Sequence, residues 1–183
     1  MSVPGHESLE ASPWVRRWSQ LVPAGARVLD VACGGGRHVR WFAQRGCRVT
    51  GVDRDAAALA PLSAMAQTLV ADIENGPWPF DGQRFDAVVV TNYLWRALLP
   101  TLVASVADNG VLIYETFAEG NATVGRPVNP DFLLRPGELL QAVHGLRVVA
   151  YEDGFLAAPE RFVQRIVAVR ESPAGASPRR YPL

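Results

Sequence analysis

The feature of this sequence that most constrains its fold is a regular alternation of short apolar segments with segments of helical periodicity. This alternation predicts a doubly wound, Rossmann-like α/β sheet, mostly parallel, with helices on both faces. Two apolar segments near the C-terminus have no helical pattern between them, which predicts an antiparallel hairpin at the end of a seven-stranded sheet. The predicted strands are 27–31, 48–53, 68–72, 86–92, 111–117, 146–151 and 162–169.

Helical periodicity and turn residues divide the rest of the chain. The turn-rich stretch 74–84 is expected to be a loop, and the Gly/Asn/Pro-rich stretch 119–135 has the length of a lid or binding loop. With no repeat and no linker, we expect one domain over 13–172, with flexible termini at 1–12 and 173–183. The predicted helices are 13–22, 37–45, 55–66, 100–107 and 136–144.

Composition excludes several classes of protein. The 183 residues carry 18 basic and 18 acidic side chains, and the basic cluster that the sequence shows is Arg179–Arg180, so no nucleic-acid partner is expected. No apolar run is long enough to cross a bilayer, so we expect no membrane partner. The two cysteines and three histidines show no metal-ligand spacing, so no metal site is predicted. A cytoplasmic location is the expectation.

A glycine-rich stretch, Asp30–Gly36, follows the first predicted strand and precedes a helix expected at Arg37. In open α/β sheets, ligands bind at this place, and glycines let the backbone approach them closely. Asp53 ends the second predicted strand, where a carboxylate can accept both hydroxyls of a ribose. These features predict a bound adenosine. The alternative is that Asp53 only caps the next helix beside Asp55.

The residues around the glycines separate the candidate adenosine ligands. A dinucleotide fingerprint needs glycine at the sixth position, and Val39 stands there. Asp30 would also repel a pyrophosphate, whereas it suits the ammonium and sulfonium of S-adenosylmethionine (SAM). No Gly-Lys-Ser/Thr follows, so a phosphate-binding P-loop is excluded.

Several motifs together resemble those of class I SAM-dependent methyltransferases. Residues 28–37 (VLDVACGGGR) resemble their motif I, Val52–Asp53 their ribose-binding strand end, and 71–73 (ADI) the motif that holds adenine. The resemblance spans about Val15 to Arg170, and the chain looks most like tellurite-resistance-type and other small-molecule methyltransferases. It implies SAM as cofactor. The implied cofactor-binding residues are Asp30, Ala32, Gly34, Gly36, Arg37, Asp53, Arg54, Asp72, Ile73 and Asn92.

Two of these residues have alternative interpretations. Asp72 either holds adenine or starts the turn into Asn75–Gly76. Arg37 either caps local carbonyls or contacts the carboxylate of the cofactor.

The same resemblance directs the methyl group toward the end of the fourth strand. Asn92–Tyr93 lacks the prolines typical of enzymes that methylate amines of nucleic acids. Tyr93, Glu115 and Arg126 are the candidate catalytic residues. Glu115 interrupts an apolar strand, so it either faces the site or pairs, for example with Arg126. Arg96 either binds an acidic acceptor or is solvated.

No histidine is expected at a strand end, so no general base is evident. This favours acceptors already nucleophilic near neutral pH, such as thiols or selenium and tellurium oxyanions, unless Tyr93 or Glu115 is the base. We therefore predict methyl transfer to a small molecule. A non-catalytic SAM-binding module and a methyltransferase acting on a protein or peptide are the alternatives, and the oligomeric state is open.

Overall fold

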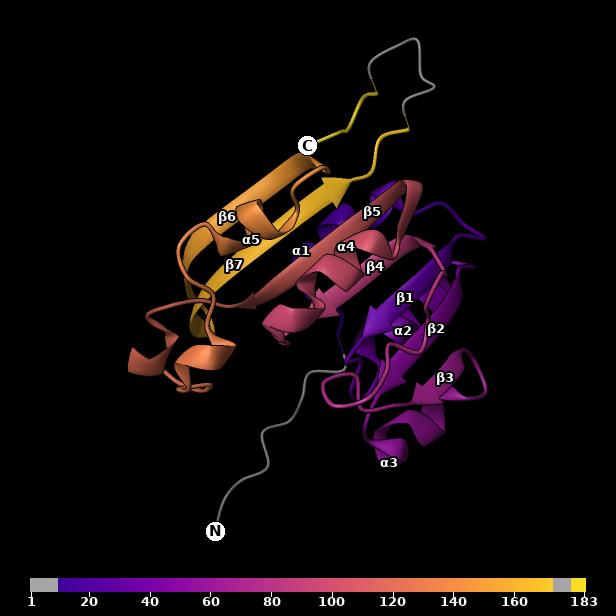
Figure 1. Ribbon diagram of the computed structural model, residues 1–183, viewed down its shortest axis with the longest axis horizontal. Helices are drawn as coiled ribbons and strands as arrows, with labels where there is room; N and C mark the ends of the chain where they lie inside the picture. The colour runs from indigo at the N-terminus through magenta and orange to yellow at the C-terminus, as the bar shows by residue number, and fades with distance from the viewer. Residues whose placement is uncertain (1–9, 173–178) are drawn as a thin grey trace.

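The computed structural model describes residues 10–172 and 179–183 and contains one seven-stranded sheet (Figure 1). The strand order is β3-β2-β1-β4-β5-β7-β6. Strands β1 to β5 pair in parallel, β7 runs antiparallel to β5, and β6 runs antiparallel to β7. The predicted sheet and its C-terminal hairpin are confirmed. The strands are β1 (Arg27–Val31), β2 (Arg48–Asp53), β3 (Gln67–Val70), β4 (Phe85–Thr91), β5 (Val106–Phe117), β6 (Arg147–Ala157) and β7 (Glu160–Val169).

Helices cover both faces of this sheet, as predicted. Helices α1, α2 and α3 pack on the face that carries Val28 and Val89, and α4 and α5 pack on the face that carries Leu29 and Val88. Figure 1 shows α4 and α5 toward the viewer and α2 behind β1. Alternate strand residues point to opposite faces, so each face of the buried strands needs its own apolar cover. The α-helices are α1 (Pro13–Trp18), α2 (Arg37–Gln44), α3 (Ala56–Leu59), α4 (Leu99–Ala104) and α5 (Glu138–Ala142).

Short 3₁₀ turns extend or replace several predicted helical segments. The helix expected over 55–66 is α3, which continues only as a 3₁₀ turn, η2 (Ala60–Leu62). Pro61 has no N–H to continue an α-helical ladder, which explains the early end. Asp55 caps α3, accepting from Ala57 N at 2.9 Å and Ala58 N at 3.1 Å. The other 3₁₀ turns are η1 (Ser19–Leu21), η3 (Arg96–Leu98), η4 (Asn121–Thr123) and η5 (Pro130–Phe132).

Strand β5 begins earlier than the sequence predicts. The expected tight turn at 108–110 lies within β5, where Asn109 takes a left-handed conformation with φ 64°. The register between β4 and β5 shifts between Phe85 and Ala87, so the extra residues form an irregularity of the strand.

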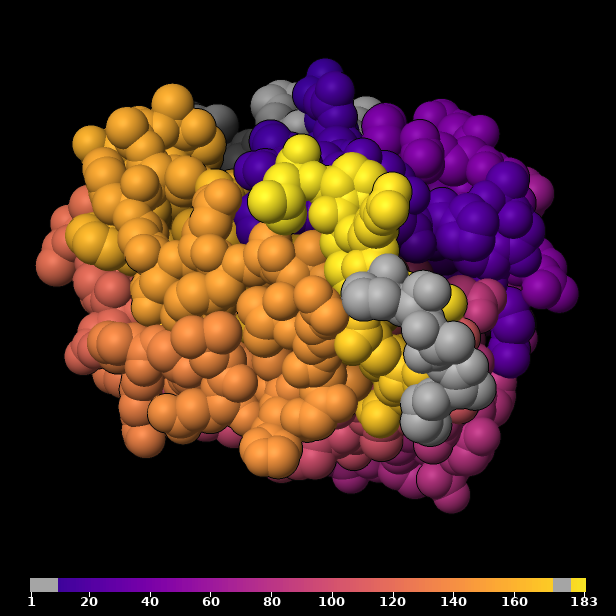
Figure 2. Space-filling view, turned by 90° about the horizontal axis from the view of Figure 1, so that it is seen from above, coloured from indigo at the N-terminus to yellow at the C-terminus, as the bar shows by residue number. Residues whose placement is uncertain are grey.

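The chain ends are more ordered than expected where the structure describes them. Ala11 and Ser12 are buried, so the flexible N-terminus predicted over 1–12 is wrong for these two residues. Of the predicted C-terminal tail, 179–183 lies between the N-terminal region and β6 (Figure 2), and Gln20 donates to the Pro182 carbonyl at 3.1 Å. Residues 1–9 and 173–178 lie outside the described part of the chain. Among the described helices, none has both the length and the apolarity needed to cross a membrane.

Candidate cofactor and acceptor site

The carboxyl ends of β1 to β4 enclose a cavity of about 250 Å³. Strand β1 lies between β2 and β4, so the winding direction reverses at β1 and a crevice opens there. Ligand pockets usually have volumes of roughly 300–1,000 Å³, so this cavity accounts for part of a ligand such as SAM. Its lining residues are Ala32, Asp53, Arg54, Ala71, Asp72, Ile73, Glu74 and Tyr93.

Asp53 joins the glycine loop to the turn after β2. Its carboxylate accepts from Gly34 N at 2.8 Å and from Asp55 N at 2.9 Å. The interpretation of Asp53 as a helix cap is wrong, because Asp55 fills that role for α3. A carboxylate has about four acceptor sites, so Asp53 keeps capacity for two ribose hydroxyls.

The glycine loop has a backbone that few residues other than glycine adopt. Gly36 has φ 74°, and a Cβ there would lie 2.3 Å from Leu62 Cδ1. Ala32 has φ 52° although it carries a side chain, and it lines the cavity. A strained residue at this place is consistent with a functional constraint on the loop.

Asp30 is a buried carboxylate with one oxygen that has no hydrogen-bond partner among the described residues. It is 1% exposed, and no described atom lies within hydrogen-bond distance of its Oδ2. Burial raises the pKa of Asp30 to about 7, although the Arg37 guanidinium and the Val39 N–H lower it in part. An unpaired buried acceptor favours a ligand that brings a hydrogen-bond donor or a positive charge, as the ammonium of SAM does.

Asp72 starts a turn, as one of the two interpretations predicted. It accepts from Glu74 N at 3.0 Å, Asn75 N at 3.1 Å and Asn75 Nδ2 at 3.0 Å. The side-chain bond from Asn75, followed by the backbone bonds, lowers the pKa of Asp72. Asp72 still lines the cavity, so the turn does not exclude the adenine role.

Tyr93 reaches the same cavity from the end of β4. Its hydroxyl is buried, and the Glu74 carboxylate of the same cavity lies beside it. Burial and the nearby Glu74 carboxylate raise the pKa of Tyr93. The Tyr114 hydroxyl donates to the Tyr93 carbonyl at 2.8 Å, which fixes the backbone of Tyr93.

Glu115 is fully buried, and its partners differ from the one that the sequence suggested. Its carboxylate accepts from Ser12 Oγ at 2.8 Å and from Arg165 Nη1 at 3.2 Å, and Arg161 Nη2 lies 3.8 Å away. Arg126, the expected partner, is exposed on the loop after η4. Antiparallel register places Glu115 opposite Arg165, a relationship that depends on two distant strands.

His38 lies beside Thr91, the last residue of β4, so the expectation that no histidine lies at a strand end is wrong. Ser12 N donates to His38 Nε2 at 3.1 Å, and Thr91 Oγ1 lies 3.4 Å from Nδ1. Burial and Arg37 lower the pKa of His38 to about 3. The imidazole is therefore neutral near pH 7, and because both nitrogens are engaged it connects the N-terminal segment to β4.

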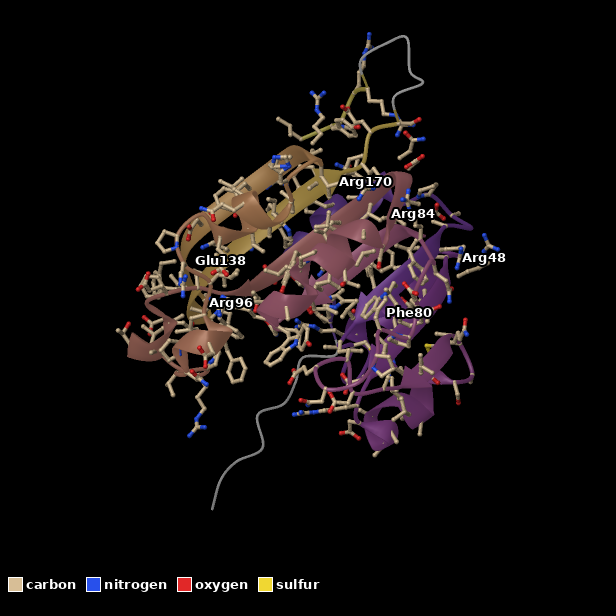
Figure 3. All side chains as sticks on the ribbon, viewed as in Figure 1. Arg48, Phe80, Arg84, Arg96, Glu138 and Arg170 are labelled. Carbon is tan, nitrogen blue, oxygen red and sulfur yellow. The ribbon has the colours of Figure 1, made fainter. Side chains whose placement is uncertain are left out.

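Arg96 is half-buried and is held by other residues of the chain, so it is not free to bind an acceptor. Its Nε and Nη2 donate to the two carboxylate oxygens of Glu138 at 2.7 and 3.0 Å (Figure 3). Its remaining donors contact the carbonyls of Asp131 and Leu133 at 2.6 and 2.7 Å. Arg96 therefore fastens the end of the 119–135 loop to the segment that follows β4.

Comparisons with known proteins agree with this geometry. The family model described as "Methyltransferase domain" matches residues 28–109, which hold the glycine loop, Asp53, Asp72 and Tyr93. Residues 28–109 are thus similar to a methyltransferase domain, and the solved structures below share the fold of this chain. The unpaired oxygen of Asp30 and the Asp53 carboxylate at this cavity fit the ammonium and ribose groups of SAM.

One curated relative and two solved structures show how far the likeness extends. A ribosomal RNA small subunit methyltransferase H from Gemmatimonas aurantiaca is 32% identical over 158 residues, covering 79% of this chain and 47% of the relative. The chain thus spans about half the length of that relative. TehB from Haemophilus influenzae has a TM-score of 0.69 at 19% identity, covering 88% of this chain and 63% of TehB. The N-methyltransferase NodS from Bradyrhizobium japonicum has a TM-score of 0.64 at 18% identity, covering 88% and 98% of the two chains.

The fold brings only part of the predicted site together. Among the residues predicted from sequence, Ala32, Asp53, Arg54, Asp72, Ile73 and Tyr93 line the cavity. The other predicted cofactor residues do not line the cavity, although Gly34 N donates to the lining Asp53 at 2.8 Å. Asn92 has φ 53°, and its N–H donates to the Glu115 carbonyl at 2.9 Å. The residues outside the lining are Asp30, Gly34, Gly36, Arg37 and Asn92. Glu74 lines the cavity but was not predicted; its place directly after the 71–73 motif was the available signal.

Proposed function

We propose that this protein transfers the methyl group of SAM to a small-molecule nucleophile such as a thiol or a selenium or tellurium oxyanion. The observation that carries the proposal is Asp53, whose carboxylate is hydrogen-bonded to the glycine loop and faces a cavity formed by four strand ends. SAM supplies an electrophilic methyl group. The lone pair of the acceptor forms the new bond to the methyl carbon while the carbon–sulfur bond of SAM breaks. The electron pair of the broken bond stays on sulfur.

In this proposal the chain's own residues bind and orient. Asp53 accepts the ribose hydroxyls, Ile73 packs on the adenine, and Asp30 pairs with the ammonium group. Tyr93, whose buried hydroxyl lies beside Glu74 in the cavity, is the candidate that contacts the acceptor. Because methyl transfer depends mainly on alignment and exclusion of water, few catalytic side chains are required.

Glu115 and Arg126 have less support as catalytic residues. The carboxylate of Glu115 already accepts hydrogen bonds from Ser12 and Arg165. We therefore propose that Glu115 positions the end of β4, because its backbone carbonyl accepts from Asn92 N. Arg126 has an exposed position on the loop and would contact only an acceptor that reaches that loop.

A second candidate function is methylation of RNA. It is favoured by the 32% identity to a protein named as a ribosomal RNA methyltransferase, although this chain covers 47% of that protein. The absence of prolines after Asn92 argues against amine methylation of nucleic acid, but it does not bear on other atoms of RNA.

Calorimetric titration with S-adenosylhomocysteine (SAH) and with NADH tests the cofactor. Hydrogen bonds to a charged group contribute roughly 1.5–3 kcal/mol each, so Asp53→Asn is expected to weaken SAH binding about tenfold or more. Asp81→Asn, an exposed loop change outside the cavity, is the matched control. A preference for NADH, or equal affinity in both variants, would contradict the cofactor assignment.

Turnover separates the candidate functions once SAH binding is established. Formation of SAH from SAM is measured with a thiol, with tellurite, with a peptide and with ribosomal RNA as acceptor. Turnover with the thiol or tellurite supports the first proposal, and turnover only with RNA supports the second. A protein that binds SAH but turns over no acceptor would be a non-catalytic SAM-binding module.

A further inference from the structure

The net charge of the chain is zero because two parts of the sequence carry opposite net charges. Residues 11–52 contain seven arginines and one carboxylate, Asp30, which gives 7 − 1 = +6. The other residues contain 11 arginines and 17 acids, which gives −6. All 18 basic residues of the chain are arginines. Asp30 is buried, and the arginine that it interacts with is Arg37.

The fold gathers much of this positive charge on one face. Helices α1 and α2 pack on the same side of the sheet, and α2 turns Val39 and Phe42 into the core. Arg37, Trp41 and Arg45 are spaced four residues apart along α2 and its C-cap, so they follow one another on one side of the helix, with Trp41 half-buried against the core. We call Arg16, Arg37, Arg40, Trp41 and Arg45 the arginine face.

Trp41 organises this face. The guanidinium carbons of Arg16, from α1, and Arg45, at the end of α2, each lie 5.6 Å from the centre of the Trp41 ring. Such cation–π contacts hold flexible arginines in place and leave their N–H groups free for a ligand. The neighbouring acid that pairs with Arg16 is Glu10, at 3.9 Å and with a side chain 83% exposed, so the pair is weak.

We propose that the arginine face is a docking surface for an RNA strand. Arginine forks match phosphate geometry, and neutralised phosphates release counterions that supply most of the affinity of nucleic acids for proteins. The stripe from Arg45 to Arg37 is about 12 Å long, at 1.5 Å per helical residue, and ends beside the glycine loop. The choice of RNA over other polyanions rests on the second candidate function. The positive charge of the arginine face is independent of that function.

Binding of fluorescein-labelled RNA tests this surface. Anisotropy is measured with the full chain and a single-stranded oligouridylate of about 20 nucleotides, a length that spans one binding groove. The variant Arg16→Gln/Arg45→Gln removes two charges that flank Trp41. The matched control is Arg84→Gln/Arg147→Gln. The side chains of these two arginines are 56% and 52% exposed, against 50% for Arg16. Like Arg16, each of them forms one ion pair with an acidic residue.

The expected result is a difference between the two double variants. At about 50 mM salt the Arg16/Arg45 variant should bind RNA about tenfold more weakly, and its slope of log affinity against log salt should be shallower by about 1.4, for two lost phosphate contacts. The control should bind as the unmodified protein does. Equal weakening in both variants, or no saturable binding by the unmodified protein, would overturn the proposal.

Two further measurements separate RNA from other polyanions and loss of RNA binding from loss of folding. Stronger binding to DNA of matched sequence or to phosphatidylserine vesicles than to RNA would overturn the choice of RNA. SAH affinity should be unchanged in the Arg16/Arg45 variant, which shows that the variant is folded. Intact SAH binding and turnover with a small acceptor, without RNA binding, would remove the docking surface and leave the methyltransferase proposal standing.

Discussion

Glu115 on β5 and Arg165 on β7 face each other across an antiparallel pair, with Oε2 and Nη1 3.2 Å apart. Arg165 also binds Glu152 on β6, at 2.6 Å, and lies over the Trp14 ring. One buried carboxylate thus links three strands to the N-terminal segment through Ser12.

Glu115→Gln should therefore destabilise the protein substantially. Removing one partner of a buried ion pair costs about 3–5 kcal/mol, and we expect a value near 3 because Arg165 keeps Glu152 as a second partner. Urea denaturation measures the free energy of unfolding. Glu160→Gln, at an exposed position, is the control and should change it little. A loss below about 1 kcal/mol would show that the pair is well solvated.

Ala32→Gly should leave the protein as stable or slightly more stable. The left-handed conformation of Ala32 costs about 1–2 kcal/mol, while glycine in the unfolded chain costs about 0.4–1 kcal/mol of entropy. The net gain is about 0.8 kcal/mol by the difference of the mid-range values. Ala58→Gly on α3, where glycine is unfavourable by about 1 kcal/mol, is the control for thermal denaturation. A less stable Ala32→Gly protein would refute the strain at this position.

Asp30 should make the stability of the ligand-free protein fall as pH rises. Its pKa is raised from 3.8 to about 7, so the folded state binds this proton more tightly than the unfolded state does. The contribution is complete below pH 4 and is lost as pH rises through 7; a shift of this size corresponds to roughly 4 kcal/mol. His38 acts in the opposite direction, because its pKa is lowered to about 3 and its contribution is lost as pH falls below 6.5.

The difference between the unmodified protein and Asp30→Asn isolates the aspartate. His38 is common to both proteins, so its contribution cancels when the free energies of unfolding are subtracted. The difference should change between pH 4.5 and 8 in the direction of a relatively less stable unmodified protein at high pH. A difference that is independent of pH would contradict the raised pKa.

Arg96→Gln should loosen the segment around residues 131–138 without weakening cofactor binding. The change removes the contacts of Arg96 with Glu138 and with the carbonyls of Asp131 and Leu133. Hydrogen exchange should become faster in this segment by about tenfold, equivalent to about 1.4 kcal/mol of local stability. Arg126→Gln, at an exposed position of the same loop, is the control. A weakened SAH affinity would instead place Arg96 in the cofactor site.

Local patterns were sufficient for most of the fold and for the cofactor half of the site. The glycine loop, Asp53 and Asp72 could be placed because each lies at or just after the end of a strand that its own apolar residues predict. The bounds of β1 and β2 and the capping role of Asp55 were predicted correctly for the same reason, since each depends on neighbouring residues in the sequence. Helix α3 was overextended because alanine-rich sequence favours a helix up to Pro61, where the ladder ends.

The acceptor half could not be predicted in the same way, because its contacts join residues far apart in the chain. Ser12 and Glu115 are 103 residues apart, Arg96 and Glu138 are 42 apart, and the partners of each depend on strand register and loop path. The arginine face has the same origin, since α1 and α2 become neighbours only by packing on one face of the sheet. The sequence by itself determined the strands, their order of winding and the cofactor loop. The tertiary structure decided which charges are neutralised and which remain free, because pairing depends on distances of a few ångströms between separate elements.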